Sequence, residues 1–427
     1  AWVDITGAAL TGADTDFFSG AVLSESSVYV FTNFIDNIRR TTAGPNNSVD
    51  IGGNAPKARF LEYLTPYMLV AYLDETNTGG AVSSFKVRWP DSGTLSVWSG
   101  GNSGSVLLSH EPSAIRGLKK LKDIAIVYKE KSAYRGNKVS TSSIFDFGGP
   151  YSTKGAYSGR AIADTGEEHI FMGLNDFHRN DGIRITDIGA PIREYLFPRL
   201  NRSLNTTCHA LHVQEYKEVW FFVTIIGQTW PTEVWKYNYE FDFWYLDDCS
   251  NIICSENYKV VAGVSWDNDS GTWDQATDTW DSVQGQASAP LQVFGDSRGW
   301  TLKRDSTVTA DDGTVVSSYF ESKDFCGLVI GGIEYDTEWM QLDIDARGTS
   351  LINLQYSTDE GASWTTAQSI QLDELIKKRT FFFDIVSKHI RFRIISSYSS
   401  KTFVMRAFQQ DGSTIECGIL NGTTRKP

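Results

Sequence analysis

Six short apolar segments recur along the chain and give the first indication of its architecture. Each is rich in aliphatic and aromatic residues, and they lie at 28–31, 68–72, 124–128, 170–174, 219–223 and 291–295. Apolar runs of this length are typical of β-strands that are buried on both faces. Their starting positions are 40, 56, 46, 49 and 72 residues apart. The spacing indicates a repeated unit, and the long last interval predicts an insertion, which we place at 250–289.

A second, amphipathic strand follows most of these segments after a short polar break. Examples are 85–89, 234–239 and 300–303. A unit of roughly 40–50 residues with a buried strand, a turn and an outer strand has the size of a propeller blade. The sheets of a propeller pack face to face around an axis, which explains strands that are apolar throughout. We therefore predict an all-β chain with a β-propeller of about six blades at 1–318, and a two-sheet sandwich is the alternative.

Helical patterns are sparse, and the spacing of apolar residues changes in the C-terminal region. Residues 190–197, with Pro191 near the start, and residues 113–120 are predicted to form short helices between blades. From residue 319 onward apolar and polar positions alternate, as they do at 351–356 and 389–394, which is typical of half-exposed antiparallel strands. We predict a β-sandwich-like module at 319–427, either separate from the propeller or folded back onto it.

Composition narrows the function classes. The 427 residues include 13% aromatic residues, which favours β-sheet, and 52 acidic against 39 basic residues give a net charge of −13. This balance argues against tight binding to nucleic acid, although DNA could still slide past such a surface. No apolar run reaches the ~18 residues of a membrane helix, and the first residues do not resemble a signal peptide, although a removed segment stays open. The five cysteines are odd in number and irregularly spaced, which indicates folding in a reducing cytoplasm rather than a disulfide framework.

Residues 357–364 match the Asp-box pattern S-x-D-x-G-x-x-W. The four specified positions of the pattern are Ser357, Asp359, Gly361 and Trp364. Asp359 can accept hydrogen bonds from turn N–H groups, Gly361 can take a positive φ, and Trp364 can pack beneath a hairpin. The eight residues resemble the boxes of sialidase-like propellers, in which the box is structural and lies away from the active site. We interpret the motif as a stabilised hairpin.

Inside the predicted insertion, a Trp–Asp pair recurs every seven residues. The pairs are Trp266–Asp267, Trp273–Asp274 and Trp280–Asp281. The first pair opens a segment that echoes a calcium loop, but no glutamate occupies the twelfth position that an EF-hand requires. We interpret the tract as an extended segment whose rings fill surface pockets, and therefore as a candidate interface.

Other chemical motifs are weak. The spacing of Cys208, His209, His212, Cys249 and Cys254 matches no standard zinc site, so we expect no metal. Residues 295–299 formally match the G-x-S-x-G nucleophile elbow, but the next segment is predicted to be a strand, so we expect a hairpin turn there. We predict no catalytic residue, no cofactor and no enzymatic activity.

Four further stretches carry a combined pattern: 123–131, 173–184, 218–222 and 233–244. Together they resemble the tail-tube β-propeller proteins of short-tailed bacteriophages. Similar tail proteins also contain Trp–Asp tracts and a late Ser–Thr–Asp–x–Gly hairpin. The resemblance extends over roughly residues 20–410. It is a general similarity of the residue pattern and does not rest on one specific motif.

The resemblance implies a structural virion protein, the tail hub or nozzle, assembled in the bacterial cytoplasm and located in the virion tail. Such a protein forms a homo-oligomeric ring, expected to be hexameric, below the head-to-tail adaptor or portal proteins. Other tail proteins or fibres would be further partners. Genomic DNA would pass through the lumen without tight binding, which suits an acidic chain.

Two other function classes remain open. One is a glycoside hydrolase with a sialidase-like propeller, which the Asp box and the abundant tryptophans favour. A sialidase needs clustered arginines and a Tyr/Glu nucleophile pair, and no stretch of this chain groups them. The other is a carbohydrate-binding, adhesive propeller whose Trp–Asp insertion contacts sugar.

Overall fold

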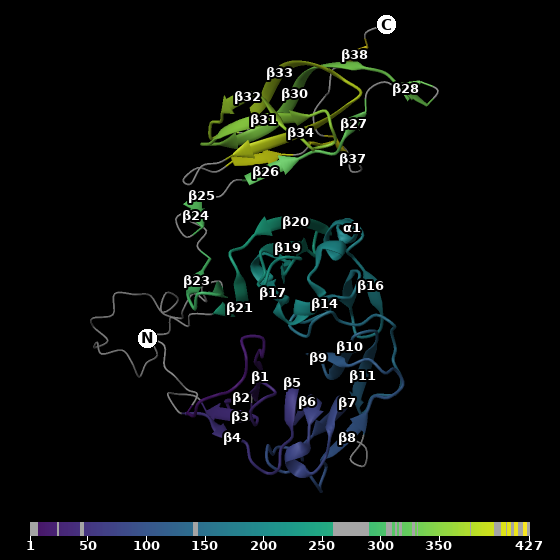
Figure 1. Ribbon diagram of the computed structural model, residues 1–427, viewed down its shortest axis with the longest axis vertical. Helices are drawn as coiled ribbons and strands as arrows, with labels where there is room; N and C mark the ends of the chain where they lie inside the picture. Colours follow the sequence, from purple (N-terminus) through teal and green to yellow (C-terminus); the bar gives the residue numbers. More distant parts are fainter. Residues whose placement is uncertain are drawn as a thin grey trace, which may run out of the picture. The chain divides into compact units, whose positions relative to one another are not determined.

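The structure is a computed structural model that divides the chain into two compact units, residues 1–304 and 305–427 (Figure 1). The sequence patterns placed the division between residues 318 and 319. The described residues are 7–23, 25–42, 47–139, 144–258, 290–304, 310–311, 314–315, 318–326, 329–330, 332–375, 377–396, 403–406, 408–410, 414–416 and 422–424.

The first unit consists of six antiparallel sheets that follow one another in chain order, five with four strands and the last with three. We call them blades one to six. Their strands are β1 (Ser19–Leu23), β2 (Val28–Thr32), β3 (Arg39–Thr42) and β4 (Val49–Asp50); β5 (Lys57–Leu64), β6 (Tyr67–Asp74), β7 (Val82–Trp89) and β8 (Gly104–Leu107); β9 (Ile115–Leu121), β10 (Ile124–Lys129), β11 (Ala133–Lys138) and β12 (Phe145–Asp146); β13 (Ile162–Asp164), β14 (His169–Met172), β15 (Phe177–Asn180) and β16 (Ile185–Asp187); β17 (His209–Val213), β18 (Glu218–Val223), β19 (Glu233–Asn238) and β20 (Phe243–Asp248); β21 (Ile252–Tyr258), β22 (Leu291–Asp296) and β23 (Thr301–Lys303).

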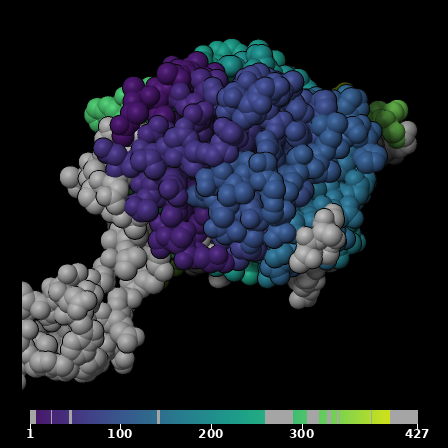
Figure 2. Space-filling model, turned by 90° about the horizontal axis from the view of Figure 1, so that it is seen from below, coloured from purple at the N-terminus to yellow at the C-terminus, as the bar shows by residue number. Residues whose placement is uncertain are grey.

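The first strand of each blade contacts the first strand of the next, so these strands form the inner ring of a propeller. All six predicted apolar segments are the second strands of their blades, β2, β6, β10, β14, β18 and β22. Neighbouring side chains on such a strand face opposite sides: in β6, Leu69 packs with blade three and Val70 with blade one. Two-sided burial explains the uniformly apolar runs, and the predicted propeller of about six blades is confirmed. Figure 2 shows the tightly packed face that blades one to three present.

The inner strands are what the sequence patterns missed. Residues 113–120, predicted as a helix, belong mostly to strand β9, so that prediction was wrong. Residues 252–258, predicted as part of an insertion, form the inner strand β21 of blade six. The short helix predicted at 190–197 is confirmed: α1 (Arg193–Leu196) continues into η2 (Phe197–Arg199) between blades four and five.

Only three other short helical turns occur among the described residues: η1 (Thr76–Thr78), η3 (Arg202–Thr207) and η4 (Gln214–Tyr216). No helix in the described part of the chain is long and apolar enough to span a membrane.

The second unit is a β-sandwich-like module, as predicted. One sheet has the order β26-β34-β31-β32, with β27 also paired to β34, and the other has the order β33-β30-β35, with β38 paired to β30. Apolar residues of both sheets, including Leu342, Leu354 and Phe381, form a single buried core. The strands are β24 (Ala310–Asp311), β25 (Thr314–Val315), β26 (Ser318–Glu321), β27 (Phe325–Cys326), β28 (Val329–Ile330), β29 (Ile333–Glu334), β30 (Thr337–Gly348), β31 (Leu351–Ser357), β32 (Thr365–Gln371), β33 (Lys377–Ser387), β34 (His389–Ser396), β35 (Phe403–Arg406), β36 (Phe408–Gln410), β37 (Thr414–Glu416) and β38 (Gly422–Thr424).

Truncating a second-strand aromatic should destabilise the propeller strongly. Phe221 is fully buried, and its ring centroid lies 4.7 Å from that of Phe177 in blade four. We expect Phe221→Ala to lower the free energy of unfolding by about 3–5 kcal/mol, because it leaves a cavity between two blades. Chemical denaturation followed by tryptophan fluorescence measures the shift in midpoint. Ile226→Ala, at an exposed position, is the control and should leave the midpoint unchanged; equal midpoints for the two variants would contradict the inter-blade packing.

Candidate functional site

The inner strands of blades two to five bring together titratable side chains from four distant parts of the chain. They are Glu62 of β5, Lys119 of β9, Asp164 of β13 and His212 of β17. Their charges act on one another: those of Lys119 and Asp164 affect the pKa of Glu62, and that of Asp164 affects the pKa of His212. This group of side chains, which we call the axial cluster, is the candidate functional site of the propeller.

Glu62 is the carboxyl group with the most perturbed environment in the axial cluster. Its side chain is half-buried, and one carboxylate oxygen accepts a hydrogen bond from the N–H of Tyr63 at 3.1 Å. Burial raises the pKa of Glu62 above its usual range, and the negative charge of Asp164 acts in the same direction, while Lys119 opposes both. A carboxyl group whose protonated form is favoured can serve as a proton donor.

Asp164 and His212 are the members of the axial cluster on blades four and five. Asp164 is exposed, and its carboxylate accepts a hydrogen bond from the N–H of Gly166 at 2.7 Å. The Nε2 atom of His212 lies 3.1 Å from the hydroxyl of Tyr239, and burial lowers the pKa of this imidazole despite the opposing charge of Asp164. The cluster therefore contains two carboxyl groups in different environments, one half-buried and one solvated, which is the arrangement that separates acid and base roles.

Arg160, two residues before β13, is a partly buried cation without a carboxylate partner among the described residues. Its guanidinium donates hydrogen bonds to the carbonyl oxygens of Thr206 at 3.3 Å and Ile253 at 2.6 Å. It also lies 3.7 Å from the ring centroid of Phe17. Burial lowers its pKa to about 10. Arg160 thereby connects the segment before blade one with blades four, five and six.

A largely buried polar network lies between blades three and four. The Nδ1 atom of His169 is 3.0 Å from the hydroxyl of Tyr128, and its Nε2 atom is 2.9 Å from the carbonyl oxygen of Lys120. Asn180 donates hydrogen bonds to the hydroxyls of Tyr128 at 2.5 Å and Tyr151 at 2.8 Å. Burial lowers the pKa of His169 to about 4, although the charge of Asp164 and the hydrogen bond to Lys120 act in the opposite direction.

The Asp-box residues form a tightly bonded hairpin between β31 and β32 of the second unit. Ser357 donates a hydrogen bond to Asp359 at 2.6 Å, and the N–H of Ser363 donates to the same carboxylate at 2.9 Å. These bonds lower the pKa of Asp359 to about 2, and Gly361 has a φ of 94°. Trp364 stacks with the guanidinium of Arg393, 3.9 Å from the ring centroid. The side chains of Ser357 and Asp359 form their hydrogen bonds within the hairpin, which agrees with the interpretation of the motif as structural.

Among the described residues, the other sequence-derived candidates do not gather into a site. The Trp–Asp tract, Trp266 to Asp281, lies outside the described residues. Within the described ranges, no three His, Cys, Asp or Glu side chains are grouped to hold a metal ion. Residues 295–299 run from the end of β22 into the turn before β23, where Asp296 accepts hydrogen bonds from the N–H groups of Arg298 and Trp300. This is the predicted strand–turn–strand geometry, not a nucleophile elbow.

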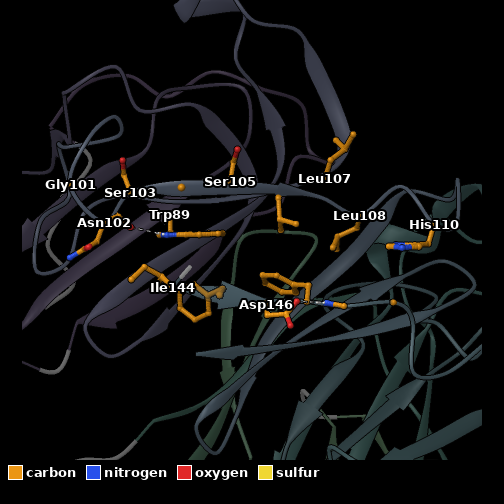
Figure 3. A pocket seen from close by; sticks show the side chains of 16 residues that line it. Trp89, Gly101, Asn102, Ser103, Ser105, Leu107, Leu108, His110, Ile144 and Asp146 are labelled. Carbon is orange, nitrogen blue, oxygen red and sulfur yellow. Dashed lines mark hydrogen bonds between the residues drawn. The ribbon is translucent and has the colours of Figure 1, made fainter. Parts of the chain in front are cut away.

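A large cavity lies at the outer edges of blades two and three rather than at the axis (Figure 3). Its volume is about 710 Å³, and the edge strands β8 and β12 border it. Trp89, Leu108, Ile144 and Phe145 contribute apolar surface to its lining. We call this cavity the rim groove.

No protein-family model and no curated protein sequence matches the chain. Among solved structures, it is similar to an exo-β-1,3-galactanase from Phanerochaete chrysosporium, at 10% identity and a TM-score of 0.30, over 95% of this chain and 98% of the galactanase. It is also similar to a glycoside hydrolase family 43 arabinoxylan arabinofuranohydrolase from Bacillus subtilis, at 8% identity and a TM-score of 0.22, over 83% and 94% of the two chains. Likenesses of this strength do not assign an activity.

These comparisons do correct one prediction from the sequence. We expected no enzymatic activity, yet the similar structures named above are glycoside hydrolases. The absence of a familiar catalytic motif was therefore not a sufficient reason to exclude catalysis. Each member of the axial cluster comes from a different blade, so these residues form no motif that is local in the sequence.

Because several of its histidines are buried, we expect the protein to lose stability in mild acid. The unfolded chain protonates His169 near pH 6.5, whereas the folded chain does so only near pH 4. Stability is therefore lost as the pH falls through this range, by about 3 kcal/mol for this residue. Burial lowers the pKa of His178, His209 and His212 as well, so these imidazoles act in the same direction.

Chemical denaturation at a series of pH values between those two limits measures this loss. His169→Gln should flatten the pH dependence, and His110→Gln, at an exposed position, should leave it unchanged. A stability that does not vary over this pH range would contradict the buried neutral imidazole.

Proposed function

We propose that this chain is a ring-forming bacteriophage tail protein, a hub or nozzle. The resemblance of its sequence to tail-tube propellers supports the proposal, and one structural feature carries it: an exposed aromatic edge on blade five. Strand β20 is the outermost strand of that blade. Phe243, Tyr245 and Leu246 of β20 are all exposed, Phe243 to 45%, and Phe241 in the preceding turn is 71% exposed.

Such an edge needs a partner. Free edge strands are normally protected by charge, proline or a covering segment, because their unpaired N–H and C=O groups invite association. An aromatic patch on an edge strand marks an interface with another chain, where aromatic side chains serve as anchors. In the proposed ring, copies of the chain associate laterally, and adaptor or portal proteins and other tail proteins bind its faces. The net charge of −13 suits a lumen through which genomic DNA passes without being held.

Imaging tests the ring. Negative-stain electron microscopy of the purified chain, alone and mixed with the adaptor or portal complex, should show closed rings, and antibody labelling should place the chain on the tail of virions. A chain that neither forms rings under these conditions nor labels virions would contradict the proposal.

A second candidate function is hydrolysis of glycosides, which the pair Glu62 and Asp164 favours. An inverting or retaining glycosidase uses two carboxyl groups, one of which must hold a proton. The raised pKa of Glu62 and the solvated carboxylate of Asp164 supply that contrast within the axial cluster. Under this alternative, Glu62 is the proton donor and Asp164 is the base or nucleophile.

Glycoside turnover distinguishes the two candidates. If the chain is a hydrolase, it releases sugar from a panel of aryl and oligosaccharide glycosides without any partner, and Glu62→Gln lowers kcat by roughly 10²–10⁴-fold. Glu256→Gln, in which an exposed carboxyl of the same inner ring is changed, is the matched control and should retain activity. A wild-type chain without turnover on the panel would exclude this second candidate.

A further inference from the structure

We propose that the propeller opens between blade six and blade one, and that Arg160 is the latch that holds this junction closed. We call the junction the seam. The inner strands β1 and β21 border it, and they would part while blades two to five stay packed. This movement belongs to a single copy of the chain and does not depend on assembly with other copies.

The seam differs from the other junctions between neighbouring blades in lacking a buried apolar cluster. Such a cluster joins each of the pairs one–two, two–three, three–four, four–five and five–six. Among the described residues none joins blade six to blade one, although Figure 1 shows that these two blades follow each other around the ring. Because burial of apolar surface is the main force that holds packed sheets together, the seam is the weakest junction of the propeller.

The side of blade six that faces the seam is exposed. Burial alternates along β21, and Glu256 and Tyr258 are among the exposed positions. Burial raises the pKa of Tyr29 in blade one, and the charge of Glu256 acts in the same direction, so this side of β21 faces blade one. The opposite side is bound to blade five, where the amide of Asn257 donates a hydrogen bond to the carbonyl oxygen of His212 at 2.7 Å.

Blade one covers its own seam side instead of packing on blade six. Tyr29 stacks on Phe31 of the same strand, with ring centroids 5.7 Å apart. A Cβ atom on Gly20 of β1 would overlap the hydroxyl of Tyr29, so this ring lies across its own blade. Val22, which pairs with Tyr29 in the β1–β2 ladder, is 60% exposed. The two blades therefore meet without the interlocked side chains that hold the other junctions.

Arg160 supplies a connection across the seam from blade four. Its guanidinium donates a hydrogen bond at 2.6 Å to the carbonyl oxygen of Ile253 in blade six. The same guanidinium lies 3.7 Å from the ring centroid of Phe17, two residues before the first strand of blade one. One side chain thus holds segments from both sides of the seam. A charged hydrogen bond and a cation–π contact are each stronger in a partly buried place than in water.

The backbone of β21 leaves an acceptor available for the latch. The register of the β21–β22 ladder shifts between Ile252 and Cys254, so Ile253 has no partner on β22. A bulge of this kind leaves the extra residue outside the ladder, and here its carbonyl oxygen accepts the bond from Arg160.

Opening at the seam therefore breaks a small set of polar and aromatic contacts, whereas parting any other pair of blades exposes a buried apolar cluster. Regions held by few buried apolar contacts open at a lower free energy than the whole molecule unfolds. Opening would give access from the side to the inner strands, on which the axial cluster lies.

Hydrogen–deuterium exchange of the full chain, read by mass spectrometry of its peptides, tests the seam. In the wild type we expect the amides of β1 and β21 to exchange at least roughly ten-fold faster than those of β14 and β18, which lie in packed blades. Arg160→Met removes the charge and keeps an apolar stem. It should accelerate β1 and β21 by roughly ten-fold more, because a charged hydrogen bond is lost, and leave β14 and β18 unchanged.

A substitution on one side of the seam tests whether the two sides are coupled. Phe17→Ala removes only the contact of Arg160 with the segment before blade one, yet it should accelerate exchange in β21 of blade six as well as in β1. Simple fraying of the first strand would change β1 alone. Arg116→Met is the matched control, because Arg116 also lies on an inner strand but pairs with Glu130, at 2.7 Å, beside its own blade. This control should leave β1 and β21 as they are in the wild type.

Three results would each overturn the proposal. In the first, β1 and β21 of the wild type are as protected as β14 and β18. In the second, Phe17→Ala leaves the exchange of β21 unchanged. In the third, Arg160→Met accelerates all strands equally, since Arg160 would then stabilise the propeller as a whole. If Arg160→Met does not fold, the response of β21 to Phe17→Ala decides.

Discussion

The propeller depends on one constraint: the second strands of blades two to five are buried on both faces. In β18 all six residues are buried, and Phe221 packs toward blade four while Phe222 packs toward blade six. A sheet with two apolar faces needs a neighbour on each side. Sheets that follow one another in the chain provide those neighbours, and a ring arrangement avoids leaving two large apolar faces in water. The short connections and the order of the blades follow from this requirement.

The interior of the ring adds a second condition, which Arg160 illustrates. Burying a guanidinium without a carboxylate is unfavourable unless other acceptors satisfy it. Here two backbone carbonyls and the ring of Phe17 do so, and these partners belong to three separate segments. Each partner is in place only when the blades and the leading segment have assembled. Arg160 therefore makes the fold around it cooperative, because a missing segment would leave a buried charge unsatisfied.

Sequence patterns were informative where the physics is local and failed where it is not. The apolar second strands were predictable, because two-sided burial leaves a continuous signal. Strand β9 was mistaken for a helix because Ile115, Leu118 and Leu121 are spaced three apart, which imitates a helical face. Its strand geometry depends on packing between blades: a Cβ atom on Gly117 would come within 2.5 Å of Ile162 in blade four. No pattern within β9 contains that information.

The axial cluster and the exposed edge of blade five show the same limit in opposite ways. Glu62 and Asp164 are about a hundred residues apart in sequence and meet only because the ring brings their strands together. Phe243 and Trp244 of β20 lie at the end of the stretch 233–244 that carries the family resemblance, but the sequence does not say that this strand ends a sheet. Because β20 is the last strand of its sheet, its aromatic rings form an exposed edge and are not part of the core. An edge of this kind is unfavourable for an isolated chain and useful for an assembling one, so the outermost strand of blade five is where the selection for assembly would be visible.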